Sequence, residues 1–117
     1  MSGSTSYHAG HHAEGIIETE YRRRGLEIIH KRWRGQGGEI DLIARNGDGF
    51  VFIEVKKSAT HAQAAERLSA AQARRIMMAA QEFVVNEPRG LDTDMRFDVA
   101  LVDAAGRAEV LENALAA

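Results

Sequence analysis

The stretch "GGEIDLIARNGDGFVFIEVKK", residues 37–57, contains two apolar runs on either side of a turn signal. Each run is typical of a β-strand, over Glu39–Arg45 and Phe50–Lys57, and the "NGDG" between them is a strong signal for a hairpin. Each run also carries an acid where a buried strand would be apolar, Asp41 in the first and Glu54 in the second. The pairing of the two strands offers a reason for these charges.

The length of the turn decides whether the two acids can act together. A turn on the central Gly-Asp of "NGDG", like a loop of all its residues, pairs Arg45 with Phe50 and therefore places Asp41 opposite Glu54. Opposed residues share one face of a sheet, whereas a slip of one residue would send them to opposite faces. Opposed carboxylates repel, so we expect a compensating cation, either Lys56 on the same face or a divalent metal ion.

The remaining alternation of the hairpin predicts where the core lies. The apolar residues on the face opposite the carboxylates are Ile40, Leu42, Val51, Ile53 and Val55, and that face is expected to hold the core. Phe52 shares the carboxylate face, so we expect that face to be partly apolar and to line a cleft. The alternative is a surface hairpin whose acids and lysine form an exposed ion-pair cluster that adds little stability.

The composition limits the class of protein. The chain has 117 residues, of which 44% are apolar and 27% charged, as in a soluble globular protein. The absence of cysteine excludes disulfides and thiolate metal sites. The sequence has no apolar run of the roughly 18 residues that a membrane span needs, and "MSGSTSYHAGHH" does not resemble a secretory signal. We therefore expect a cytoplasmic protein without a membrane partner.

The order of the predicted elements indicates the fold class. Residues 1–9 are small and polar and are expected to form a flexible tail, and residues 10–117 to form a single domain. The other predicted elements are a helix over Gly10–Arg24, a strand over Leu26–Trp33, a helix over Ser69–Asn86, a strand in "RFDVALVD" and an edge strand in "GRAEVLEN". The order α-β-β-β-α-β-β predicts an α/β domain with a mixed central sheet flanked by helices.

Basic residues concentrate in one segment although the formal net charge is −2. Six of the fifteen fall in "RRRGLEIIHKRWR" against the single acid Glu27, and they are Arg22, Arg23, Arg24, Lys31, Arg32 and Arg34. One reading is a solvated helix end followed by an edge strand. The other is a patch that faces phosphates. Trp33 fits either a core position or a base-stacking platform.

The acidic hairpin resembles a known signature. "GGEIDLIA" followed by "FVFIEVKK" is similar to the motif of the YraN-like family of small uncharacterised bacterial proteins. It also resembles the wider PD-(D/E)xK nuclease superfamily, which includes restriction endonucleases and archaeal Holliday-junction resolvases. The likeness extends from about Gly10 to Val102, and it implies a restriction-endonuclease-like fold.

The resemblance can be carried over residue by residue. Asp41 matches the motif aspartate of the superfamily, and Glu54 and Lys56 match its ExK element. Glu14, in the first helix, matches an additional acid of the resolvase-like members. Ile40 stands where the superfamily motif has proline, a departure that is usual in this family.

These matches imply a metal-dependent endonuclease. Asp41, Glu54 and the backbone carbonyl of Val55 would bind Mg²⁺ or Mn²⁺, and Lys56 and Glu14 would complete the catalytic group. Gln72 stands where many relatives carry lysine, a change that would alter phosphate contacts. The substrate would be a nucleic acid, with branched or structured DNA favoured over RNA.

Contacts with the phosphate backbone would come from basic side chains. The expected ones are Arg22, Arg23, Arg24, Lys31, Arg32, Arg34 and Lys57. Cutting a junction would call for a homodimer, because a small domain with one site reaches one strand. Two alternatives stay open at this point. One is a non-catalytic nucleic-acid-binding module of the same fold, and the other is an assembly domain that does not depend on divalent ions.

Overall fold

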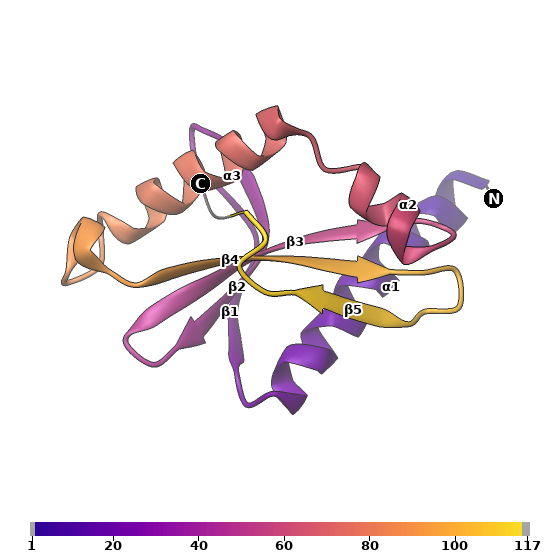
Figure 1. The fold of residues 1–117 in the computed structure, drawn as a ribbon, viewed down its shortest axis with the longest axis horizontal. Coiled ribbons are helices and arrows are strands. Elements are labelled where there is room, and N and C mark those ends of the chain that lie inside the picture. Colours follow the sequence, from indigo (N-terminus) through magenta and orange to yellow (C-terminus); the bar gives the residue numbers. More distant parts are fainter. Residues whose placement is uncertain (1, 116–117) are drawn as a thin grey trace.

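The computed structural model describes residues 2–115, and the side chains from residue 12 onward (Figure 1). The helices are α1 (Ser2–Arg23), α2 (His61–Glu66) and α3 (Ala70–Val84), with a 3₁₀ turn η1 (Gly90–Asp92). The strands are β1 (Glu27–Arg34), β2 (Glu39–Asn46), β3 (Gly49–Lys57), β4 (Met95–Val102) and β5 (Ala108–Leu111). The predicted order of long elements and the α/β class are confirmed.

The strands form one mixed sheet in the order β1-β2-β3-β4-β5. Neighbours are antiparallel except β3 and β4, which are parallel and are connected through α2 and α3. Helix α2 was not predicted, because its six residues are too few to establish a helical period. Its start is nonetheless local, since the hydroxyl of Thr60 accepts a hydrogen bond from the Gln63 backbone N–H at 3.1 Å.

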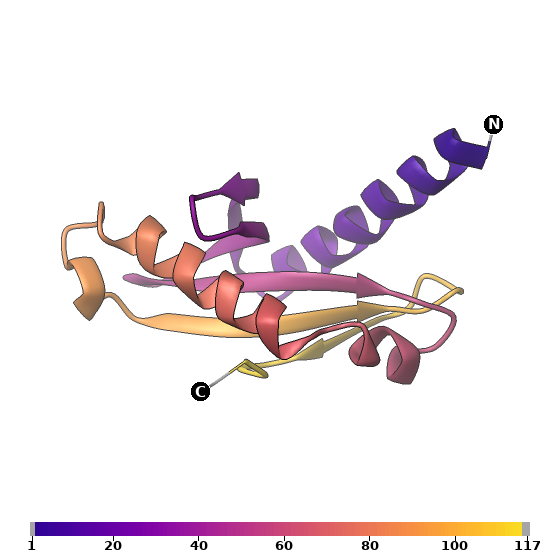
Figure 2. The ribbon, with the colours of Figure 1, turned by 90° about the horizontal axis from the view of Figure 1, so that it is seen from above.

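Helix α1 begins at Ser2, well before the predicted start at Gly10, and ends at Arg23, two residues before Gly25, whose φ of 83° favours glycine. Figure 2 shows α1 rising away from the sheet toward its N-terminal end, with α2 on the other side of the sheet. Residue 1 of the predicted tail lies outside the described residues, and the flexibility of the tail stays a prediction. No helix within residues 2–115 is long and apolar enough to cross a membrane.

Both faces of the sheet are buried, so the prediction of a single core face is wrong. On one face, Ile17 and Tyr21 of α1 pack over Leu42, Val51 and Ile53. The carboxylate face packs under α3 and is at least as apolar, because a parallel crossover covers the second face of a sheet with a helix.

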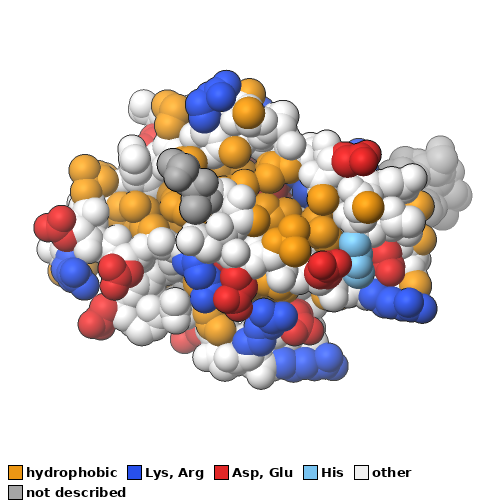
Figure 3. Space-filling model, in the orientation of Figure 1, with side chains coloured by type: hydrophobic (Ala, Val, Ile, Leu, Met, Phe, Trp, Pro, Cys, Tyr) orange, Lys and Arg blue, Asp and Glu red, His pale blue; other side chains and the backbone are white. Residues whose placement is uncertain are grey.

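Aromatic rings dominate the face under α3. The Phe83 ring of α3 meets the rings of Phe50, Phe52 and Trp33 edge-on, with centroids 5.1, 5.9 and 5.4 Å away. Trp33 is therefore partly buried and packs against this core, which favours the core position over the base-stacking platform. Figure 3 shows apolar side chains gathered along the seam between α3 and strands β4 and β5.

The hairpin has the predicted register. Arg45 pairs with Phe50 and Leu42 with Ile53, around a turn on residues 47 and 48. The backbone ladder ends at the Leu42–Ile53 pair, one step before Asp41. The alternation of side chains along β2 breaks at this point. Ile40 was expected on the same face as Leu42, which packs under α1, but it lies in the core under α3.

Candidate active site

The two strands of the hairpin part beside a cavity of about 220 Å³. Four elements contribute to it, because α1 crosses the sheet at this point, β2 pairs with β3, and β1 pairs with the other edge of β2. Its charged lining consists of Glu14, Arg32, Asp41, Glu54 and Lys57. The predicted carboxylate pair therefore shares one cavity, together with the predicted helix acid.

Asp41 is fixed by the strand it faces. Its Oδ2 accepts a hydrogen bond of 2.8 Å from the backbone N–H of Val55. The side chain thus takes over the N–H at the point where the backbone ladder has ended. This bond holds the carboxylate against β3, directly beside Glu54, and brings the Val55 backbone to the cavity wall.

Glu54 is only 5% exposed, and its environment is short of positive charge. Its Oε1 accepts a hydrogen bond of 3.0 Å from the Gln72 amide and lies 3.4 Å from the Lys56 ammonium. Burial, and then the negative charge of Asp41 and a hydrogen bond with it, raise the pKa of Glu54 to about 8, although Lys56 acts in the opposite direction. Asp41 and Glu54 therefore favour holding a proton, or another cation, between them.

Gln72 makes a contact with Glu54 that was not predicted from the sequence. It was singled out only as a change in phosphate contacts, whereas its amide holds the buried glutamate. Ser69 begins α3 by accepting a hydrogen bond from the Gln72 backbone N–H at 3.0 Å, which places Gln72 in the first turn over the sheet. The "S-x-x-Q" cap was readable in the sequence, but its contact with Glu54 was not.

The donor set suits a hard divalent cation. Mg²⁺ is usually held by one or two carboxylates and several waters, so a site with two carboxylates and a nearby backbone suffices. Among the side chains that the structure describes, those of residues 12–115, there is no group of three or more His, Cys, Asp or Glu that could hold a metal ion. The fit therefore rests on Asp41 and Glu54, with water completing the shell.

Glu14 lines the cavity but is engaged elsewhere. Its Oε2 lies 3.3 Å from Nε of Arg32, which belongs to β1. Arg32 has a φ of 52°, a left-handed conformation that costs a non-glycine residue roughly 1 kcal/mol. The strained backbone directs this guanidinium across the mouth of the cavity, so Glu14 stands at the rim of the site.

Most of the predicted phosphate-binding side chains are neutralised by glutamates. Arg22 and Lys31 both pair with Glu18, Arg24 with Glu20 and Glu112, and Arg34 with Glu39. Arg23 is exposed at the end of α1. A nucleic-acid role for this segment stays a prediction.

The chain was compared with known proteins. The model of the uncharacterised protein family UPF0102 matches residues 13–102. A UPF0102 protein of Cereibacter sphaeroides strain KD131 is 59% identical over 117 residues, which cover 100% of both chains. One from Ruegeria pomeroyi is 54% identical over 112 residues, covering 96% of this chain and 91% of the relative. One from Dinoroseobacter shibae is 47% identical over 111 residues, covering 95% and 83%.

Proposed function

Since the chain belongs to the uncharacterised protein family UPF0102, the YraN-like family that its hairpin resembles, we propose a function from the carboxylate pair. The function is the metal-dependent hydrolysis of phosphodiester bonds in a nucleic acid, with structured DNA as the favoured substrate. The names of these relatives state no activity, so the proposal depends on the site alone.

One observation carries the proposal. A glutamate buried to 5% exposure lies beside a second carboxylate, in a cavity, without enough positive charge around it. A purely structural acid would be expected to gain full compensation from its neighbours, because burying an uncompensated charge is costly. The arrangement is the one that a divalent cation would stabilise, and perturbed acids in a cavity are typical of functional sites.

Each side chain has a distinct task in this reaction. Asp41 and Glu54 bind the cation, and Gln72 keeps the Glu54 carboxylate in place by holding Oε1. When bound, the cation supplies activation of water and neutralises charge on the phosphate. Lys56, which is 16% exposed and adjacent to Glu54, holds a fixed positive charge toward the charge that develops on the phosphate.

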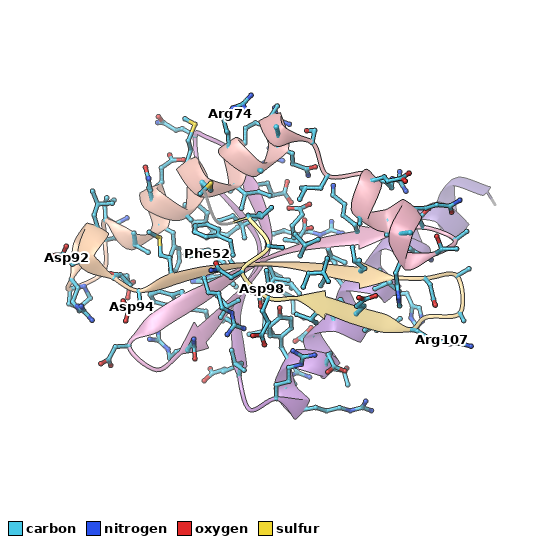
Figure 4. The ribbon with its side chains drawn as sticks, in the orientation of Figure 1. Phe52, Arg74, Asp92, Asp94, Asp98 and Arg107 are labelled. Carbon is cyan, nitrogen blue, oxygen red and sulfur yellow. The ribbon has the colours of Figure 1, made fainter. Side chains whose placement is uncertain are left out.

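The test is cleavage of labelled DNA duplex, single strand and four-way junction, and of RNA, in Mg²⁺, Mn²⁺ or EDTA. We expect cleavage with divalent cations, none in EDTA, and at least a ~100-fold loss of rate in Asp41→Asn and in Glu54→Gln. Asp92→Asn is the matched control, because Asp92 is exposed in η1 at the other end of the molecule from the β4–β5 turn (Figure 4). It should cleave like the wild type.

Three results would contradict the proposal. Cleavage by Glu54→Gln at the wild-type rate would remove the carboxylate pair from the reaction. Binding of nucleic acid without cleavage, in every cation, would favour the non-catalytic module instead. Independence of both binding and stability from divalent ions would favour the assembly domain.

Thermal unfolding gives a measure of the cation site that does not need a substrate. A cation that binds only the folded protein raises its midpoint of unfolding. We expect Mn²⁺ to raise the midpoint of the wild type and to leave that of Asp41→Asn nearly unchanged. An equal rise in both proteins would place the bound cation elsewhere.

A further inference from the structure

A second cavity, of about 120 Å³, adjoins the one that holds the carboxylates. The two cavities share Ala13 of α1 and Lys57 of β3 in their linings. The second continues past His12 and Ile16 to the turn between β4 and β5 at Gly106. Both cavities lie along α1, near the carboxyl ends of the parallel strands β3 and β4, and we refer to the two adjacent cavities as the groove.

The far end of this groove is built from a turn with its own internal bonding. Asp103 is an acid in the lining, but its Oδ1 accepts hydrogen bonds from the backbone N–H groups of Ala105 and Arg107, at 3.0 and 2.8 Å. Its Oδ2 faces His61, 3.9 Å from Nε2. The acid is therefore committed to the turn. Figure 4 shows Arg107 at the tip of that turn, beyond the strand ends.

Lys57 lies where the two cavities meet, and it differs from the other cations of the site. Lys56 pairs with Glu54, and Arg32 pairs with Glu14. Among the described side chains, no acid forms a salt bridge with Lys57, which is half-buried in the groove wall. Its ammonium is thus available to an anion that lies in the groove.

The size and lining of the second cavity fit a phosphate group. Its volume corresponds to about four water molecules, which suits a small anion rather than a nucleoside. Ala13 and Ile16 form an apolar wall that offers nothing to a base edge, whereas lysine is a common phosphate contact. A contact of this kind positions a strand without reading its sequence.

We propose that the groove holds one nucleic-acid strand across two adjacent subsites. The phosphate to be cut lies over Asp41 and Glu54, and the neighbouring phosphate of the same strand lies in the second cavity against Lys57. His12 marks where the strand leaves the groove. This inference rests on the proposed nuclease function. It gives Lys57 the role of fixing where the strand is cut.

The test is binding of single-stranded oligonucleotides, followed by fluorescence anisotropy, with Ca²⁺ in place of Mg²⁺ to limit cleavage. Each oligonucleotide carries one neutral methylphosphonate, placed at successive positions along the strand. For the wild type, we expect a several-fold loss of affinity when the phosphate next to the cut is neutral. Lys57→Met should bind the unmodified strand several-fold more weakly, with a salt slope smaller by about 1, and should not respond to that methylphosphonate.

Two variants serve as controls. Lys57→Arg keeps the charge and should restore both the affinity and the response. Arg74→Met removes one exposed cation from α3, outside the groove (Figure 4), and should behave like the wild type. The midpoint of thermal unfolding should be the same in Lys57→Met and the wild type, because no salt bridge is lost.

The outcomes separate this inference from the proposed function. If Lys57→Met responds to every methylphosphonate as the wild type does, the second subsite is wrong, although cleavage that depends on Asp41 would still support the nuclease. If Asp41→Asn cleaves normally while Lys57→Met loses the response, the groove binds the strand and the assigned chemistry is wrong. If the wild type binds no oligonucleotide, the second subsite is wrong, and if it also cleaves none of the DNA and RNA substrates, both proposals fail.

Discussion

Asp98 and Glu54 are buried carboxyl groups on neighbouring parallel strands, and the protein treats them in opposite ways. Asp98 is 0% exposed and Glu54 is 5% exposed. Asp98 pairs in register with Ile53, the residue before Glu54, so the two acids lie close in the sheet but face opposite sides of it. Asp98 faces α1, and Glu54 faces α3.

The surroundings of Asp98 compensate it fully. The Tyr21 hydroxyl donates to it at 2.6 Å, the Arg96 guanidinium donates two bonds of 2.9 Å, and the Asn113 backbone N–H donates a further one of 2.9 Å. The single negative charge of Asp98 thus accepts four hydrogen bonds, two of which come from the one cation, Arg96. This network ties α1, β4 and the C-terminal turn together, and Figure 4 shows Asp98 in the middle of the fold.

The surroundings of Glu54 do not compensate its negative charge. It has one amide and one lysine at 3.4 Å, a second carboxylate beside it, and a cavity in front. The comparison teaches that burial of an acid does not by itself indicate function. The informative feature is a buried acid next to a like charge, without compensation by the fold.

The largest effect on stability is expected when the carboxylate of Asp98 is replaced by an amide. Asp98→Asn removes the charge that Arg96 faces and turns an acceptor into a donor opposite the Tyr21 hydroxyl. We expect the free energy of unfolding to fall by about 3 kcal/mol, because one partner of a buried ion pair is lost. Urea denaturation would measure it, and a loss below about 1 kcal/mol would mean that the network contributes little.

The pH dependence of the free energy of unfolding should reveal the raised pKa of Glu54. The pKa of Glu54 is about 8 in the folded protein and near 4.5 when unfolded, so the folded state holds a proton that the unfolded state releases. Its stabilising effect is complete below pH 4.5 and is lost as the pH rises through about 8. In EDTA, the free energy of unfolding should fall by a few kcal/mol across this window, because each unit between the two pKa values corresponds to about 1.4 kcal/mol.

Comparison with Glu54→Gln isolates the contribution of this residue. The other charged groups are the same in both proteins, so the difference between the two pH profiles isolates the loss of the Glu54 carboxyl. Parallel profiles would show that Glu54 is not the group responsible.

The same Glu54→Gln change should stabilise the protein at pH 8.5, opposite in sign to Asp98→Asn. Glutamine keeps an acceptor for Gln72 and removes the charge that faces Asp41. We expect the free energy of unfolding to rise by about 1 kcal/mol in EDTA, as is common when a functional site is neutralised. Urea denaturation at pH 8.5 would measure it, and destabilisation would mean that the Lys56 contact outweighs the repulsion.

The smallest expected effect is that of Tyr21→Phe. The change removes one of the four donors around Asp98 and leaves the guanidinium in place. The free energy of unfolding should fall by about 1 kcal/mol, as for a single buried hydrogen bond. Thermal unfolding would detect it. A loss as large as that of Asp98→Asn would show that the hydroxyl, and not Arg96, carries the network.

Much of the fold followed from local patterns. The "NGDG" turn and the alternation of the hairpin predicted the register around the Arg45–Phe50 pair, which the structure confirms. The alternation failed at Ile40, because Asp41 bonds to the Val55 backbone through its side chain there and the ladder has already ended. The burial of both faces was missed, because Ile43, Phe50 and Phe52 make the carboxylate face apolar but do not indicate which element covers it.

The sequence by itself determined that Asp41 and Glu54 share one side of a hairpin, because side-chain direction and turn length are properties of neighbouring residues. Only the tertiary structure decided which buried acid is compensated. Tyr21 reaches Asp98 across 77 positions of the chain, and Gln72 reaches Glu54 across 18. Desolvation and charge pairing are sums over elements that meet only on folding, so no local pattern contains them.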